Sequence, residues 1–273
     1  MQSKTTVKIN KFNRNKLTSQ SIELSEFVRQ QLNEVGYVVI EDFCDNNNID
    51  LAKSEFLNLC HEIGYPISHD VNNSIIWDIK NNSKSNSFIK TYSEHNHEAE
   101  FHTDSQYSSY PEDYFGLYTI RPAQCNGGKS YLLSLKDILT ELRSIQNGYD
   151  IEKILSETNF PFIVPNVFKK ESNNDFEYNF GPILRSNEIR FRIDTFEKAI
   201  IQRPDFCTEK QIEAYNILKE IILKSQRQQS FYLKEKDLIF INNKTMLHGR
   251  SSFTDENRHL LRIRMNKINL DLN

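Results

Sequence analysis

The sequence predicts a mainly β protein with helical supports (α+β), whose core is a double-sheet β-fold. From about residue 72 onward, Asn/Ser-rich turns separate roughly eight or more short strand-like runs. Helical patterns lie mostly before these runs or interrupt them. Apolar residues make up 38% of the 273 residues and aromatic residues 11%, which is enough material for one large core. We therefore expect a single domain over residues 1–273, with supporting helices at about 17–66, a sheet core at about 72–266 and a helical insert at about 205–227.

Two amphipathic helices are expected near the N-terminus. Residues 22–35 place apolar side chains at helical spacing, and Gly36 ends this helix just before the apolar run YVVIEDF. A second helix fits residues 49–64, where Gly64 and Pro66 end it. The order helix, strand, helix therefore precedes the sheet core.

The sheet core is predicted from short runs of β-branched and aromatic residues bounded by turns. The expected strands are SIIWDI (74–79), SFIKTY (87–92), YFGLYTI (114–120), KSYLLSL (129–135), FPFIV (160–164), EIRFRID (188–194), SFYLK (230–234), DLIFIN (237–242) and LLRIRM (260–265). Two further helices, over 135–145 and 208–226, interrupt them.

Charge and cysteine usage restrict the function classes. A formal net charge of −3 offers no general attraction to nucleic acid or to anionic membranes, so neither is an expected partner. The basic N-terminal residues lack the apolar stretch of a secretory signal, and no window approaches a membrane span. The widely spaced Cys44, Cys60, Cys125 and Cys207 are typical of reduced packing residues. We expect a cytoplasmic protein with a small-molecule substrate, whose oligomeric state the sequence leaves open.

Candidate metal ligands occur in the run AEFHTD and beyond the strand DLIFIN. In an extended chain His102 and Asp104 point to the same side and present an imidazole and a carboxylate to one space. His248, at the edge of a turn, is the best candidate for a third ligand. Two histidines and one carboxylate would cover one face of an octahedral ion, an arrangement suited to ferrous iron. The alternatives are a surface strand pair for the first two residues and a core histidine for the third.

An anion site is predicted beside the metal. Arg258, Arg262 and Arg264 have even spacing and would share one face of a strand. A buried arginine near the metal is a natural anchor for a dicarboxylate, because it forms two parallel hydrogen bonds with a carboxylate. The tight turn at residues 127–128 precedes Ser130, whose hydroxyl can share that task. The alternative for Arg258 is an ordinary surface ion pair within its charged loop.

The order of these motifs resembles a known enzyme family. HTD at 102–104, RPAQCNGGKS at 121–130, LIFINNKTMLHGR at 238–250 and RHLLR at 258–262 together are similar to the Fe(II)/2-oxoglutarate-dependent oxygenases of the taurine dioxygenase and clavaminate synthase-like (TauD/TfdA) group. The resemblance covers roughly residues 35–266. It implies a double-stranded β-helix, the distorted jelly roll, with iron held by His102, Asp104 and His248.

The resemblance also implies a cosubstrate site and a reaction. Arg258 and Ser130 would hold the far carboxylate of 2-oxoglutarate, although the family often has threonine in place of this serine. Arg262 would touch either the cosubstrate or the substrate. The implied reaction uses O2 and 2-oxoglutarate, releases succinate and CO2, and hydroxylates an unactivated C–H bond of a small polar metabolite, plausibly an amino acid or derivative in specialised metabolism. Because Asp104 is present, we expect hydroxylation rather than halogenation, with desaturation or oxidative decarboxylation as alternatives.

The run EHNHEAEFHTD supports a rival interpretation, because His95, His97, Glu98 and Glu100 are also potential ligands. A cupin-like or zinc metalloprotein would use such a cluster, but the glutamates follow too closely and the flanking glycines of a cupin are missing. A jelly-roll binder without turnover is a further alternative. We expect a loop that contacts substrate instead.

The candidate substrate contacts are Tyr92, Glu98, Glu100 and Arg192, with a solvated charged surface as the alternative for each.

Overall fold

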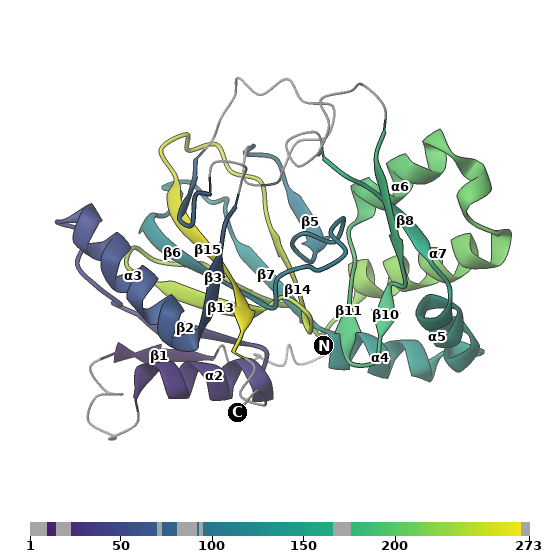
Figure 1. The fold of residues 1–273 in the computed structure, drawn as a ribbon, viewed down its shortest axis with the longest axis horizontal. Coiled ribbons are helices and arrows are strands. Elements are labelled where there is room, and N and C mark those ends of the chain that lie inside the picture. Colours follow the sequence, from purple (N-terminus) through teal and green to yellow (C-terminus); the bar gives the residue numbers. More distant parts are fainter. Residues whose placement is uncertain are drawn as a thin grey trace, which may run out of the picture.

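A computed structural model describes residues 10–14, 23–69, 73–80, 92, 95–165 and 176–268. Within these residues the core consists of two main sheets (Figure 1). The larger has seven strands: β1 (Lys11–Asn13), β2 (Tyr37–Glu41), β13 (Leu238–Asn242), β6 (Tyr114–Arg121), β15 (His259–Lys267), β3 (Gly64–Ile67) and β4 (Trp77–Ile79), the last also pairing with β15. The smaller has four strands in the order β12 (Gln229–Phe231), β7 (Ser130–Ser134), β14 (Met246–Arg250) and β5 (Ala99–His102). All pairs are antiparallel except β1 with β2.

The two main sheets enclose one apolar cluster. Phe115 and Leu260 from the larger sheet pack in it with Leu132 and Phe231 from the smaller sheet. Strand β15 shows the alternation clearly, because Leu260 belongs to this inner cluster whereas Leu261 and Ile263 belong to the cluster on the other face. The even-numbered arginines of β15 therefore share the inner face with Leu260.

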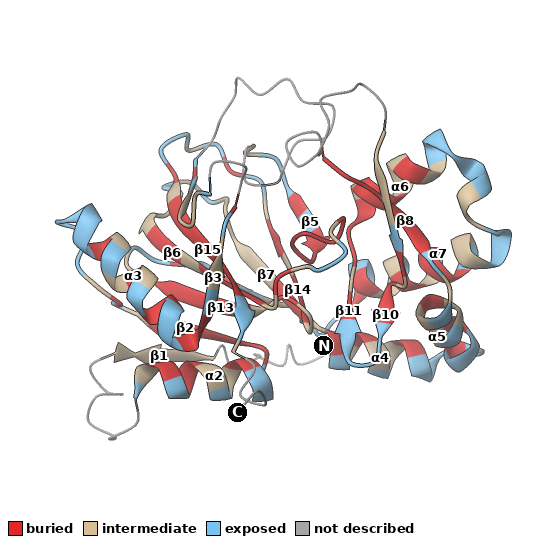
Figure 2. Cartoon of the chain, in the orientation of Figure 1, coloured by how far each residue is buried: buried red, intermediate tan, exposed pale blue. Residues whose placement is uncertain are grey.

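Helices α2 (Leu24–Glu34) and α3 (Ile49–Ile63) cover the outer face of the larger sheet. Figure 2 shows that the buried sides of both helices face the strands. The contact is close at Gly116 of β6, where an added Cβ would lie 2.8 Å from the ring of Phe56 and 2.9 Å from that of Phe240. These helices form a rigid backing for the strands that carry the arginines.

A second helical group covers the outer face of the smaller sheet, where Leu133 and Leu247 join its apolar cluster. It contains α4 (Leu135–Ser144), α5 (Gly148–Glu157), α6 (Ile193–Gln202), the short helix η4 (Pro204–Phe206) and α7 (Glu209–Lys224), with strands β8 (Phe160–Ile163), β9 (Tyr178–Gly181), β10 (Leu184–Arg185) and β11 (Glu188–Ile189). No helix in the described part of the chain is both long enough and apolar enough to cross a membrane.

The α+β expectation is confirmed as a mixed architecture with several sheets, and the four expected helices are present. The run EIRFRID was wrongly expected to be one strand: only Glu188–Ile189 are extended as β11, and α6 begins at Ile193. The helix α5 was not expected. The run SIIWDI is a strand only from Trp77 onward, whereas SFIKTY, except Tyr92, and the start of the first expected helix lie outside the described residues.

Candidate active site

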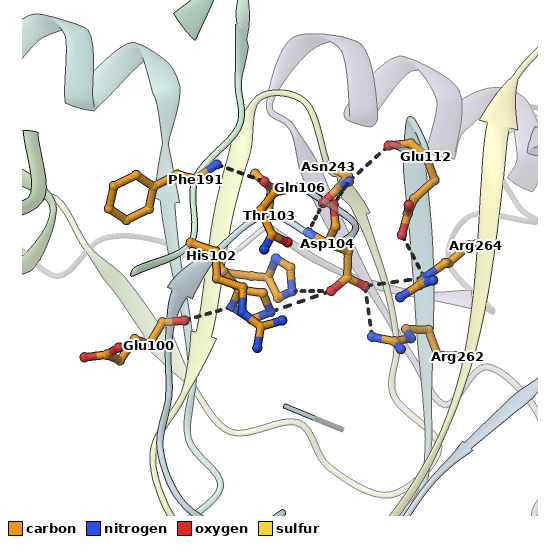
Figure 3. A network of polar contacts seen from close by, with 12 residues as sticks. Glu100, His102, Thr103, Asp104, Gln106, Glu112, Phe191, Asn243, Arg262 and Arg264 are labelled. Atoms are coloured by element: carbon orange, nitrogen blue, oxygen red, sulfur yellow. Dashed lines mark hydrogen bonds and ion pairs between the residues drawn. The ribbon is translucent and has the colours of Figure 1, made fainter. Parts of the chain in front are cut away.

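Three side chains with metal-binding atoms converge at the end of β5. His102 ends this strand, Asp104 follows it, and His248 lies in β14, directly paired with His102. Nε2 of His102 and Nε2 of His248 lie 3.6 and 3.7 Å from Oδ1 of Asp104 (Figure 3). One ligand atom from each residue lies within 4.8 Å of the others, and no other such group of three occurs in the described residues. Both N–O distances are short enough for one metal ion at about 2.1 Å from each atom to contact Oδ1 and the imidazole nitrogen.

The backbone of β5 orients the first histidine. Nδ1 of His102 lies 2.8 Å from the carbonyl oxygen of Glu100. Because a carbonyl can only accept, Nδ1 carries the proton and Nε2 keeps its lone pair directed at Asp104. The ring of His248 packs 4.1 Å from that of His102 and 4.7 Å from the ring of Phe115. Packing and one hydrogen bond thus preset both imidazoles.

Asn243, in the turn between β13 and β14, fixes the backbone of Asp104 from both sides. The amide N–H of Asp104 donates to Oδ1 of Asn243 at 2.7 Å, and Nδ2 of Asn243 donates to the carbonyl of Asp104 at 3.1 Å. The same Nδ2 also donates to the carbonyl of Glu112 at 3.0 Å. Asn243 is fully buried, so these bonds are not exchanged with water. The loop after β5 is thereby held against the turn between β13 and β14, and β14 carries His248.

Two buried arginines of β15 neutralise the carboxylate of Asp104. Nη1 of Arg262 donates to Oδ2 of Asp104 at 2.9 Å, and Nε of Arg264 lies 3.8 Å from the same oxygen. Arg264 also pairs with the buried Glu112 at 2.8 Å. Nε of Arg262 donates to Nε2 of His69 at 2.9 Å, so His69 accepts as a neutral imidazole. One oxygen of Asp104 is held by arginine while the other faces the two histidines (Figure 3).

These surroundings keep the ligand side chains in the forms that bind a metal. Burial alone raises the pKa of Asp104, but Arg262 and the contacts with both histidines outweigh burial and hold this pKa well below its usual value. Burial and the neighbouring His248 lower the pKa of His102 to about 4. At neutral pH the carboxylate is therefore ionised and His102 is neutral.

A second feature is a cavity of about 380 Å³ between the two sheets, lined by Arg258, Ser130, Thr119, Gly127 and Gly128 among others. Arg258 is buried beside Phe253, 5.1 Å from the ring centroid, and no carboxylate of the described residues pairs with it. Burial, with Arg250 nearby, lowers the pKa of Arg258 to about 9. A buried cation without an acidic partner, facing a cavity, is a site for an anionic ligand.

The expected substrate contacts divide into two groups. Tyr92 packs 4.5 Å from the ring of His102, and the guanidinium of Arg192 lies 4.2 Å from the centroid of Tyr92. Arg192 also pairs with Asp194. Glu100 holds His102 through its backbone carbonyl, and its side chain is exposed. Glu98 is exposed and, within the described part of the chain, makes no hydrogen bond or ion pair with the metal-binding residues.

Sequence reasoning missed three residues of this site: His69, Glu112 and Asn243. Arg264 had been singled out by its even spacing but had been given no role. The three missed residues contact partners distant in the chain, and a single histidine, glutamate or asparagine in a loop carries no periodic signal. Only the position of Asn243, immediately after a predicted strand that leads to His248, could have drawn notice.

Two histidines and a carboxylate with converging ligand atoms could hold one metal ion in the facial arrangement used by non-haem iron oxygenases. Solved structures share the fold. An asparagine oxygenase in complex with Fe(II), 3-hydroxyasparagine and succinate matches with a TM-score of 0.66 at 13% identity, over 89% of this chain and 79% of that one. The non-heme iron oxygenase OrfP in complex with Fe and α-ketoglutaric acid matches with a TM-score of 0.65 at 17% identity, over 93% and 83%. PvcB of Pseudomonas aeruginosa matches with a TM-score of 0.61 at 15% identity, over 89% and 80%.

The family model described as "Taurine catabolism dioxygenase TauD, TfdA family" matches residues 3–264. A comparison with the curated proteins gave no match. The chain belongs to the TauD/TfdA family. It is therefore an oxidoreductase that uses iron(II) and 2-oxoglutarate. The enzyme class and the cofactors expected from the sequence are confirmed.

Proposed function

We propose that this oxygenase binds iron through His102, Asp104 and His248, binds 2-oxoglutarate through Arg258 and Ser130, and hydroxylates an amino acid or an amino-acid derivative. The most direct support is the convergence of the neutral imidazole of His102, the ionised carboxylate of Asp104 and the imidazole of His248 on a single space. The substrate class is supported by the asparagine oxygenase and by OrfP, whose complexes contain hydroxylated asparagine and hydroxylated arginine. In the reaction, O2, 2-oxoglutarate and the C–H substrate give the alcohol, succinate and CO2.

Iron(II) and 2-oxoglutarate, when bound, supply the activation of dioxygen that C–H hydroxylation requires. The residues of the chain hold the metal and the cosubstrate in place. Asp104 offers Oδ1 because Arg262 occupies Oδ2, and His102 offers Nε2 because its Nδ1 donates to the backbone. Arg258 pairs with the distal carboxylate, and the buried Leu233 and Leu260, which also line the cavity, shield part of this ion pair from water.

Arg262 and Arg192 are the proposed cationic contacts for a substrate carboxylate. Arg262 lies beside the metal site but already donates to Asp104 and His69. Arg192 lies over Tyr92, which itself packs on His102. The proposed fold is the double-stranded β-helix, supported by two facing antiparallel sheets, in a single domain over residues 1–273. Its proposed location is the cytoplasm, supported by four unpaired cysteines.

The assignment is tested by anaerobic titration of the metal-free protein with Fe(II) and then 2-oxoglutarate, following the visible charge-transfer band of the chelate. We expect the band in the wild-type protein and none in His102→Ala. Arg258→Ala should need a 2-oxoglutarate concentration roughly 30-fold or more above that of the wild type to give the same band, because this variant removes the buried charge that pairs with the distal carboxylate. The control Arg203→Ala removes an exposed arginine paired with Asp205 and should behave as wild type.

No band in the wild-type protein would contradict the iron and cosubstrate assignment. A screen of amino acids by succinate release then tests the substrate class. The product mass separates hydroxylation, which adds one oxygen, from desaturation, which removes two hydrogens.

A further inference from the structure

We infer that Thr119 is a specificity-determining residue of the Arg258 cavity: its hydroxyl donates a hydrogen bond to the distal carboxylate of a five-carbon 2-oxo diacid and so helps the enzyme select diacids over 2-oxo monoacids. The inference rests on the proposed function, because it assumes that 2-oxoglutarate occupies this cavity. It adds a third contact to those of Arg258 and Ser130, from a residue of β6 that lies outside the four sequence motifs.

The side chain of Thr119 lies inside the protein and lines the cavity. Thr119 is completely buried and is one of the cavity-lining residues, together with Arg258 and Ser130. On β6, the residues two and four positions earlier, Leu117 and Phe115, pack in the cluster between the sheets. Thr119 therefore faces the same inter-sheet space. Its neighbour across β15 is Leu260, which also lines the cavity.

The hydroxyl of Thr119 has no partner among the described residues. The backbone of Thr119 is fully used, since its N–H donates to the carbonyl of Asp237 and its carbonyl accepts from Lys236, both at 2.9 Å. A buried hydroxyl without a partner destabilises a protein, and valine would fill the same volume without that cost. A retained hydroxyl that faces a cavity is therefore best explained by a ligand.

The chemistry of that ligand follows from the other groups around the cavity. Arg258 supplies a buried positive charge that no carboxylate of the described residues neutralises. A threonine hydroxyl that lines the same cavity as a guanidinium can donate to the anion that the guanidinium binds. A hydrogen bond to an ionised acceptor is stronger than one to a neutral acceptor. A carboxylate has enough lone pairs to accept from the guanidinium and from two hydroxyls at once. A terminal methyl group, in contrast, would leave all these donors buried without partners.

The test uses two nearly isosteric variants, Thr119→Val and Thr119→Ser, loaded anaerobically with Fe(II). Dissociation constants are measured from the charge-transfer band for 2-oxoglutarate and for 2-oxopentanoate, which has the same chain length but no distal carboxylate. We expect Thr119→Val to raise the dissociation constant of 2-oxoglutarate by about tenfold and to change that of 2-oxopentanoate by less than about twofold. Thr119→Ser should retain the wild-type ratio of the two dissociation constants. Without ligand, Thr119→Val should melt at the same or a higher temperature than wild type.

Thr195→Val is the matched control, because Thr195 is equally buried but its hydroxyl is already paired with Gln106. This variant should lose thermal stability and keep the ratio of the two dissociation constants. Equal weakening of both ligands by Thr119→Val, or no weakening of either, would overturn the inference while leaving the proposed function intact. A wild-type protein that gives no band with 2-oxoglutarate would refute the proposed function, and the role of Thr119 with it.

Discussion

At the scale of single residues, the metal site depends on a side chain that has no bond to a metal. Asn243 makes three hydrogen bonds, two of them with the backbone of Asp104. The carboxylate of Asp104 is itself held by Arg262. Contacts of this kind fix the direction of a ligand, and their loss typically lowers metal affinity by about 10- to 100-fold.

Asn243→Ala should therefore affect both folding and metal binding. We expect the free energy of unfolding to fall by about 2–4 kcal/mol, because three buried backbone groups lose a partner. Metal affinity should fall by about 10- to 100-fold, measured by Mn(II) titration under conditions where the variant remains folded. The control is Asn242→Ala, because the Asn242 side chain, within the described residues, bonds only to the backbone of Leu32 and Lys244. Equal metal affinities in the two variants would contradict a positioning role for Asn243.

At the scale of elements, the turn before β7 and the loop before β15 are fitted to each other. The N–H of Gly128 donates to the carbonyl of Ser252 at 3.1 Å, and the N–H of Lys129 donates to Oγ of Ser251 at 2.9 Å. A Cβ on Gly127 would overlap the carbonyl oxygen of Ser252 and lie 2.7 Å from Cα of Phe253. Glycine is required here because two backbones touch.

Gly127→Ala should force this turn and loop apart and so widen the cavity at Arg258. We expect weaker binding of 2-oxoglutarate and a loss of about 1–3 kcal/mol in stability, measured by the charge-transfer titration and by urea unfolding. In the control Gly181→Ala, the added Cβ meets only the end of the flexible Arg190 side chain. If Gly127→Ala binds 2-oxoglutarate as well as this control does, the close packing is irrelevant to the cavity.

The same scale explains what the sequence could predict. The inner and outer faces of β15 follow from alternation, and α2, α3 and α7 follow from apolar residues at helical spacing. The start of α6 was taken for a strand because Ile189, Phe191 and Ile193 alternate with charged residues, whereas the helical spacing appears only further on, at Phe196 and Ala199. The pair His102 and Asp104 was predictable because its spacing is local, whereas His248 was predicted from its place after an apolar strand and from the order of motifs. The contacts of His69, Glu112 and Asn243 were not, because they depend on tertiary packing.

At the scale of the whole molecule, buried histidines connect the site to the stability of the fold. The pKa of His102 is lowered by burial and by His248 to about 4, and the pKa of His69 is lowered mainly by burial and then by Arg262. Both are neutral when folded but gain a proton near pH 6.5 when unfolded. Below pH 6.5 the unfolded state therefore binds more protons than the folded state. The free energy of unfolding must then decrease as the pH is lowered.

We expect the free energy of unfolding of the metal-free protein to fall between pH 6.5 and about 4, by up to about 1.4 kcal/mol per pH unit for each histidine. Asp104 contributes only near the acidic end of this window, where the unfolded chain begins to protonate it while its lowered pKa keeps it ionised in the folded state; this also reduces stability. Glu100, whose pKa is raised by burial, acts in the opposite direction near the acidic end. Urea unfolding at pH 7, 6 and 5 measures the slope, which should be smaller in His69→Gln. Constant stability over this range would contradict neutral buried histidines.

The pairing of β5 with β14 gives bound iron a role beyond chemistry. Strand β5 has four residues and lies at one end of the smaller sheet, where its register with β14 is irregular after His248. A metal shared by His102, Asp104 and His248, as proposed, would join this short strand to its neighbour and close the long chain loop between residues 102 and 248. Loop closure of this kind acts on the unfolded chain in the same way as a covalent cross-link. Bound at the proposed site, iron would therefore also stabilise the tertiary structure.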